Sequence, residues 1–408
     1  MKISPLLALC LCAGWAFGAE NSPPPPPIPE TGLEFIDTSF ENASPLYWEV
    51  GSDGVIQIHL LYDQQRSSPN RAAGHFHFQL QAKPGSKLTL EFRNMDNVWN
   101  GKHGSIAKEL KSVVISTDGL KWQTVATRVL PENRIQVDLE MPGPKLFVAR
   151  LEPYRISDLE RFLSAIQSNP SVAIEKIGRT VEGRDLEIVR VGNPAAPHRV
   201  FLRARAHAWE SGGNWVVQGL IQRLLKSDAE AKALQERYCL YVMPMANQDG
   251  VARGHTRFNS QGWDLNRNWD KPAPEDVAPE NFWLEKWLVR MKERGQTPDL
   301  GLDLHNDGGG NLHISRPDVP GLEKYLADMA RFEALLRKHT WFTEGSTGSS
   351  FHNPGTLGDG WFERFGIPAA ILEFNCNWIA GKQKIPQGAD WEEFGAGFAR
   401  VFFEYLGG

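Results

Sequence analysis

The hydrophobic pattern of this 408-residue chain changes near Tyr154, and that change sets the kind of fold we expect. Between Leu33 and Pro153, short apolar or alternating segments are separated by Pro-Gly and Asp-Gly turn signals. Regularly spaced short strands of this kind are typical of an all-β sandwich. Beyond Tyr154, helical and strand-like segments alternate, which predicts helices covering a largely buried sheet. Because 408 residues exceed what one core usually serves, we expect two domains, at 33–153 and 154–408.

The first residues have the composition of a targeting segment. Lys2 is followed by an apolar run over 6–13 and by small residues that end at Gly18. A short charged region, an apolar region and a small-residue cleavage site in this order indicate a secretory signal peptide. We therefore expect a signal at 1–18 and a periplasmic or secreted protein. The proline-rich segment at 19–32 is then an extended tether.

Composition narrows the partners further. The chain has 44 lysines and arginines against 49 aspartates and glutamates, a net charge of −5, which argues against nucleic acid as a partner. No segment is long enough to predict a transmembrane helix. A lipid anchor on Cys10 or Cys12 is the alternative to a cleaved signal.

Cys239 and Cys376 lie in apolar surroundings, so buried thiols are expected, although an exported protein permits a disulfide.

Reactive side chains stand at or just beyond the ends of predicted strands. His207 and Glu210 follow an apolar run that ends at Arg203, His305 follows a second run, and Glu373 ends a third. Hydrolytic zinc sites typically use three protein ligands and keep a fourth position open. Two histidines and a glutamate at successive strand ends offer such a set, since α/β proteins place their sites there.

Two details of this metal site stay open from the residues alone. Either Asp303 or Asn306 could orient the imidazole of His305 from behind. His75 and His77 share one face of a predicted strand and could bind a metal themselves, but no third ligand lies nearby in the sequence.

A carboxylate and a polar loop complete the set. Glu373 in an apolar strand is costly unless it is paired or functional, so it is either a buried ion pair with an arginine or a general base. Arg267 next to Asn266 suits a carboxylate held by bidentate hydrogen bonds. Arg257, nearby in the same loop, suits the stabilisation of a developing oxyanion. Taken alone, this loop would also fit an ordinary solvated segment.

In this order, the motifs resemble the zinc carboxypeptidase family related to carboxypeptidase A. The motifs that carry the resemblance are His207-Ala-Trp-Glu210, Asp264-Leu-Asn-Arg-Asn268, His305 and Glu373. The preceding β region is similar to the bacterial cytosolic-carboxypeptidase-like branch of that family. The resemblance implies an α/β fold in which a carboxypeptidase-like mixed sheet is flanked by helices and preceded by an all-β sandwich domain.

The resemblance also implies roles for individual residues. One Zn²⁺ ion would bind to His207, Glu210 and His305, with Glu373 as general base. Arg257 would stabilise the oxyanion, and Asn266 and Arg267 would hold the C-terminal carboxylate of a peptide substrate.

One position departs from the family pattern. The family has a mobile tyrosine before a conserved glycine and aspartate, and here Gly355 and Asp359 follow Phe351 instead. A phenyl ring covers a substrate but donates no hydrogen bond, so we expect substrate binding weaker by about 1 kcal/mol. Gly358, where the family places a residue that sets specificity, carries no charge. The sequence therefore leaves the side-chain preference open.

The sequence as a whole predicts a secreted zinc metallocarboxypeptidase acting on peptides with a free C-terminal carboxylate. One alternative keeps the chemistry but changes the substrate, as an amidohydrolase of peptidoglycan stem peptides. The other alternative is a catalytically inactive protein whose β domain binds a partner.

Overall fold

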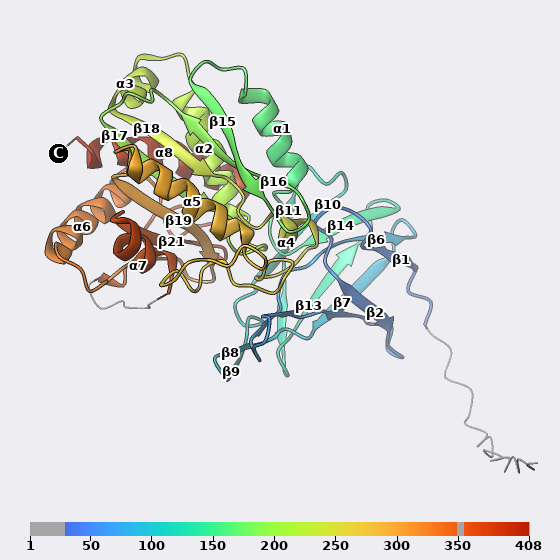
Figure 1. Cartoon of the computed structure of the whole chain (residues 1–408). Helices are drawn as coiled ribbons and strands as arrows, with labels where there is room; N and C mark the ends of the chain where they lie inside the picture. The colour runs from blue at the N-terminus through green and yellow to red at the C-terminus, as the bar shows by residue number, and fades with distance from the viewer. Residues whose placement is uncertain (1–28, 349–354, 408) are drawn as a thin grey trace, which may run out of the picture.

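The computed structural model describes residues 29–348 and 355–407. The expected signal peptide, most of the tether and Phe351 lie outside these residues. Within the described part, the first half is all β and the second half alternates strands with helices (Figure 1). None of its helices is long and apolar enough to cross a membrane.

Two five-stranded sheets form a sandwich in the first half. Along β13, Ile135, Val137 and Leu139 are buried while the residues between them face outward, as expected for a strand with one face on a core. Both sheets contribute to one apolar core, so the predicted sandwich is confirmed. One sheet has the order β1 (Leu33–Asp37), β6 (His77–Ala82), β14 (Lys145–Ala149), β10 (Ser112–Ser116) and β11 (Gln123–Ala126). The other has the order β12 (Arg128–Leu130), β13 (Arg134–Glu140), β7 (Lys87–Arg93), β3 (Ile56–Leu60) and β2 (Leu46–Val50).

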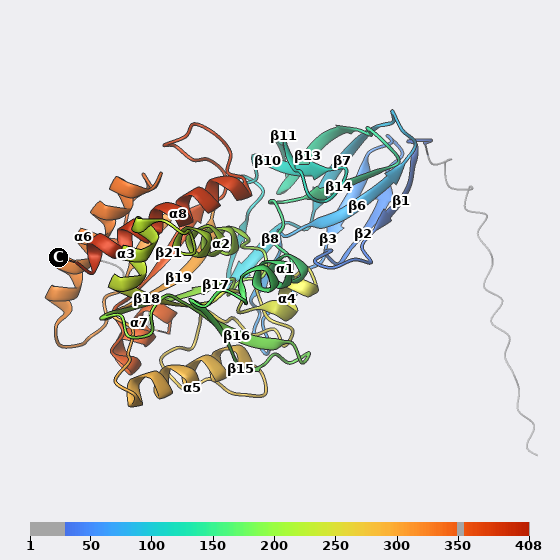
Figure 2. The same ribbon diagram turned by 90° about the horizontal axis from the view of Figure 1, so that it is seen from above.

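A third, small sheet extends from the sandwich towards the second half. Its strand order is β4 (Asp63–Gln64), β5 (Arg71–Ala72), β8 (Asp96–Trp99) and β9 (Lys102–Ser105). Both views place β8 on the side of the β region that faces the α/β region (Figures 1 and 2). We call these four strands the small sheet.

A seven-stranded mixed sheet forms the centre of the second half. The four inner strands β18, β17, β19 and β21 run parallel, and β16 and β20 pair antiparallel with β18 and β21 at the two sides of this group; β15 pairs antiparallel with β16. The predicted mixed sheet is thus confirmed. Its order is β15 (Val172–Arg179), β16 (Asp185–Val191), β18 (Tyr238–Met243), β17 (His198–Ala204), β19 (Leu300–Asp307), β21 (Ala369–Asn375) and β20 (Asn311–Ile314).

Helices cover both faces of this sheet and bury a separate apolar core on each. One core contains residues of α1 (Ile156–Ile166), α2 (Gly212–Leu224), α3 (Ala229–Arg237), α6 (Leu322–His339) and α8 (Gly388–Tyr405). The other contains residues of α5 (Pro279–Glu293), α7 (Leu357–Gly360) and the adjoining turn Trp361–Phe365. Figure 2 shows α2 and α8 on one side of the sheet and α5 on the other. The short α4 (Gln248–Ala252) begins the long loop between β18 and α5.

Candidate active site

Strand register brings the catalytic candidates side by side. Asp303 and His305 lie on one face of β19, because successive side chains of a strand alternate between faces and Leu302 and Leu304 belong to the core on the other face. His305 pairs with Glu373 of β21. A predicted metal ligand and the predicted base are therefore direct neighbours across two parallel strands.

His207 and Glu210 reach the same place from the loop that follows β17. Arg205 starts this loop in the left-handed region, with φ at 63°. Its buried guanidinium donates hydrogen bonds to the Ala208 carbonyl at 2.8 Å and to Oδ1 of Asn214 at 3.0 Å. These bonds fold the loop back over the sheet, so both side chains point to His305.

The three predicted ligands form a buried cluster. Nδ1 of His207 lies 2.8 Å from Oε1 of Glu210, and Nδ1 of His305 lies 2.7 Å from Oε2 of the same carboxylate. The two Nδ1 atoms are 3.1 Å apart. Zn–N bonds of about 2.0–2.1 Å place tetrahedral ligand atoms about 3.3 Å apart, so this donor set fits one zinc ion. Within residues 29–348 and 355–407, it is the only group of three such residues close enough to hold a metal.

Each imidazole has a carboxylate behind it. Nε2 of His305 lies 2.7 Å from Asp303, and Nε2 of His207 lies 3.2 Å from Asp264. Such contacts fix the ring orientation and leave Nδ1 for the metal. Of the two expected candidates, Asp303 contacts the ring, whereas Asn306 accepts the backbone N–H of Gly212 at 2.9 Å.

Arg203 was missed by the sequence analysis, although a charged residue ending an apolar strand was a usable signal. It pairs with Asp303 in the register of β17 and β19. Its Nε and Nη2 donate to the two carboxylate oxygens at 2.8 and 2.5 Å, and both residues are fully buried. A bidentate pair of this kind keeps Asp303 ionised and fixed in place.

The two glutamates of the site have opposite electrostatic environments. Burial opposes the ionisation of Glu210, but His207 and His305 outweigh it and lower the pKa of Glu210 to about 2. Burial raises the pKa of Glu373 to about 8; nearby Glu210 adds to this rise, and His305 opposes it. A permanently charged ligand therefore lies beside a carboxyl group able to exchange a proton near neutral pH.

Among residues 29–348 and 355–407, Glu373 has no ion-pair partner. No arginine forms a salt bridge with it in the described part of the chain, and its Oε2 is enclosed without a hydrogen-bond partner. A buried carboxylate oxygen without a described partner, next to the cluster, is expected where a water molecule or a substrate binds. The alternative in which Glu373 forms a buried ion pair with an arginine therefore has no support among the described residues.

A cavity of about 300 Å³ opens above the cluster. Residues of both halves of the chain line it. From the second half these include Trp209, Glu210, Arg257, Arg267, Asp307 and Glu373, and from the β region Arg71, Asn97, Trp99, Ile106, Glu109 and Arg150.

The predicted substrate-binding arginines reach this cavity. Arg257 donates from Nε to Asp264 at 2.8 Å, with 22% of its side chain exposed. Arg267 is half-buried, and its Nη1 donates to the carbonyl of Asn266 at 2.7 Å. Asn266 itself is buried: its Oδ1 accepts the N–H of Leu357, and its Nδ2 lies 3.3 Å from Nε2 of His305. Phe351 is outside the described residues, so its place at the cavity stays a prediction.

The sequence also left open a metal site at His75 and His77 and a disulfide between Cys239 and Cys376. Nδ1 of His77 lies 3.2 Å from Oδ1 of Asn42, and neither His77 nor His75 belongs to a possible metal group among the described residues. Cys239 and Cys376 are both free and buried, so the permitted disulfide does not form.

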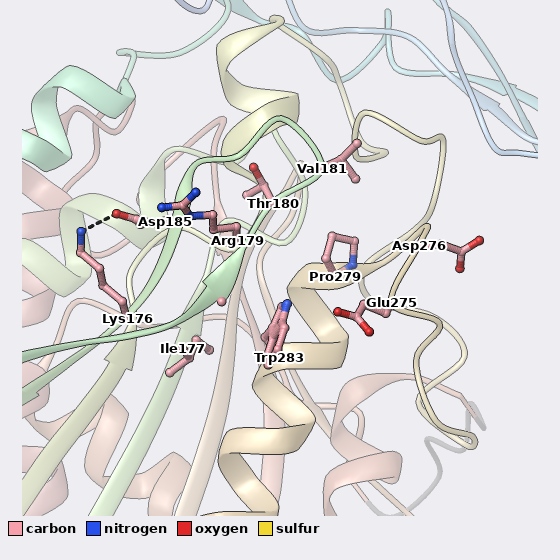
Figure 3. Close-up of a pocket in the computed structure, with 11 residues that line it drawn as sticks. Lys176, Ile177, Arg179, Thr180, Val181, Asp185, Glu275, Asp276, Pro279 and Trp283 are labelled. Carbon is pink, nitrogen blue, oxygen red and sulfur yellow. Dashed lines mark hydrogen bonds and ion pairs between the residues drawn. The ribbon is translucent and has the colours of Figure 1, made fainter.

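A larger depression of about 700 Å³ lies elsewhere, between the β15–β16 hairpin and the start of α5 (Figure 3). Its charged side chains include the Lys176–Asp185 pair, and Trp283 packs where a side chain on Gly178 would otherwise lie. It holds no metal-binding cluster of described residues. Size alone therefore does not identify the site, and we place it at the smaller cavity.

Comparison with known proteins confirms the family resemblance. Residues 159–287 match the zinc carboxypeptidase family, peptidase M14. The cytosolic carboxypeptidase 2 of Macaca fascicularis is 32% identical over 204 residues, which are 47% of this chain and 24% of that protein. The chain therefore aligns with about a quarter of the length of this relative.

Solved structures share the fold over nearly the whole chain. The metallo-carboxypeptidase of Burkholderia cenocepacia has a TM-score of 0.76 at 22% identity and covers 92% of this chain and 99% of its own. The metallo-carboxypeptidase of Pseudomonas aeruginosa has a TM-score of 0.77 at 23% identity and covers 91% and 100%. The β region followed by an α/β region is thus a recurring arrangement, and the predicted fold class is confirmed.

Proposed function

We propose that this chain, which contains a domain of the zinc carboxypeptidase family, hydrolyses the C-terminal peptide bond of peptide substrates. The observation that carries the proposal is the cluster of His207, Glu210 and His305 directly beside the unpartnered carboxylate of Glu373. A binding protein without activity would not need a buried carboxylate oxygen without a described partner at that point.

The residues of the cluster would hold the metal, and Glu373 would move the protons. Zinc, when bound, supplies a Lewis acid that lowers the pKa of water and polarises a carbonyl group. Glu373, whose Oε2 has no described partner, would accept a proton from the attacking water and return it to the leaving amine. Asp303 and Asp264 keep the two imidazoles in the orientation that presents Nδ1.

The arginines at the cavity would select the end of the substrate. Arg257, fixed by Asp264, offers its remaining N–H groups to the oxyanion that forms at the scissile carbonyl. Within the described part of the chain, the guanidinium of Arg267 has one hydrogen bond, to its neighbouring carbonyl, so most of it is left for a substrate carboxylate. A clamp of this kind would restrict cleavage to the last residue of a peptide.

We further propose that the protein is exported, on the basis of the charge, apolar run and small residues over 1–18. Mass measurement of the protein recovered from a periplasmic fraction tests this point. A protein shortened at Gly18 would support export, and an intact N-terminus in the cytoplasm would contradict it.

The direct test compares a peptide with its C-terminal amide. The wild type should hydrolyse the free acid with the larger kcat/KM, because only the acid binds the clamp. Arg267→Ala should raise KM for the free acid by about 10- to 100-fold, because the variant loses a hydrogen bond to a charged group. Arg294→Ala, an exposed arginine after α5, is the matched control. Equal hydrolysis of acid and amide by the wild type would contradict the proposal.

A further inference from the structure

The small sheet of the β region reaches the arginines of the cavity. Trp99, the last residue of β8, has the guanidinium carbon of Arg257 4.6 Å from its ring centroid. The guanidinium carbon of Arg267 lies 5.2 Å from the same ring. One indole from the first half of the chain therefore contacts both arginines that the second half presents to the substrate.

The same sheet also holds the backbone of Arg257. Oδ2 of Asp63, a buried residue of β4, accepts the backbone N–H of Arg257 at 2.5 Å and that of Phe258 at 3.2 Å. The ring of Phe258 stacks on Trp99, with centroids 6.3 Å apart and 16° between the planes. Two residues of the small sheet thus fix this loop segment at its backbone and at its side chains.

The second half alone offers these arginines few restraints. Among the described residues of that half, Arg257 has a single side-chain partner, Asp264, and the guanidinium of Arg267 bonds only to the carbonyl of the preceding residue. Both lie in the long loop between β18 and α5, and both carry positive charge in one cavity. An aromatic face attracts guanidinium groups and offsets part of their mutual repulsion.

We propose that Trp99, supported by Asp63, is a positioning residue for substrate hydrolysis: it holds the oxyanion arginine and the clamp arginine in working geometry. This inference rests on the proposed function. It assigns the small sheet a defined task, because catalytic groups must be placed within about 0.5 Å of their working positions. The active site is then complete only when both halves of the chain are present.

Trp99→Leu tests the inference in the full-length, zinc-loaded protein. We expect kcat/KM for a free-acid peptide to fall about tenfold, with a lower kcat from Arg257 and a higher KM from Arg267. The preference for free acid over amide should shrink as well, which a loss of folding stability alone would not produce. Zinc content should stay equal to that of the wild type. Trp48→Leu, the same change in the outer strand β2, is the control and should keep wild-type kinetics.

A conservative variant makes the test independent of folding. Trp99→Phe keeps a smaller aromatic face and should lose about threefold in kcat/KM, between the wild type and the leucine variant. If Trp99→Leu has a lowered melting temperature or less zinc, the decision passes to Trp99→Phe. Wild-type kinetics in Trp99→Phe would then overturn the inference.

The outcomes separate this inference from the proposed function. An active wild type together with unchanged kcat, KM and acid preference in Trp99→Leu would overturn the role of Trp99 alone. A zinc-loaded wild type that cleaves neither peptide would overturn the proposed function. Binding of benzylsuccinate, a dicarboxylate, by calorimetry would still test Trp99 in that case, since the leucine variant should bind it about tenfold more weakly. Equal affinity would overturn the inference.

Discussion

The metal cluster and the cavity wall above it are built in different ways. The cluster is buried, comes from one half of the chain, and has a carboxylate behind each histidine. The wall contains arginines from a long loop, backed by Trp99 from the other half. The difference suggests that strand register and the loop held by Arg205 place the proposed chemical groups within one half, whereas packing between the two halves places the groups proposed to recognise the substrate.

The largest loss of activity should come from changing Glu373, which lies beside the cluster and also lines the cavity. Glu373→Gln keeps the shape of the side chain but removes the base, so kcat should fall by about 10²- to 10⁴-fold. Zinc content should not change, since Glu373 is outside the ligand set. Steady-state kinetics and metal analysis check this, with the exposed Glu293→Gln as control. A kcat within twofold of the wild type would contradict the role of Glu373.

A matched pair of substitutions contrasts the two regions in stability. Arg203→Met removes the arginine partner of the buried Asp303, and the free energy of unfolding should fall by about 3–5 kcal/mol. Arg267→Met, the same change in the wall, should cost less than about 1 kcal/mol, because that side chain is only partly buried and its described partners are a backbone carbonyl and the ring of Trp99. Denaturant unfolding of the two variants measures the difference. Equal losses would mean that the wall is as rigidly built as the cluster.

How much the sequence could predict follows the same division. Glu373, His305 and the β-sandwich pattern were visible because period-two alternation and strand ends are local properties. Asp303 could be named but not chosen over Asn306, since only the strand register decides between them. Trp99 and Asp63 had no signal at all, because their roles depend on how two separately patterned halves pack. Phe351 stays a prediction.

The last prediction concerns how stability depends on pH through Glu280, a buried glutamate outside the metal cluster. Burial raises the pKa of Glu280 to about 8 from its usual 4.5; Asn259, in the loop that carries Arg257, donates to Oε2 at 3.1 Å. The folded state therefore binds this proton more tightly than the unfolded state. Its contribution to stability is full below about pH 4.5 and is lost as the pH rises through about 8.

Glu280→Gln should flatten this dependence. Melting temperatures at pH 5, 7 and 9 should show the wild type losing stability relative to the variant as the pH rises. Glu293→Gln, an exposed glutamate of the same helix, is the control and should follow the wild type. If the curves of the wild type and Glu280→Gln run parallel over this range, Glu280 does not carry a raised pKa.

The zinc content of dialysed protein, measured by mass spectrometry, tests the central claim most directly. We predict one zinc ion per chain in the wild type and in Trp99→Leu, and a large loss of zinc in His305→Ala. That result would show that the cluster of His207, Glu210 and His305 binds the metal independently of the wall. A wild type without zinc, or a His305→Ala variant that retains a full equivalent, would contradict the account.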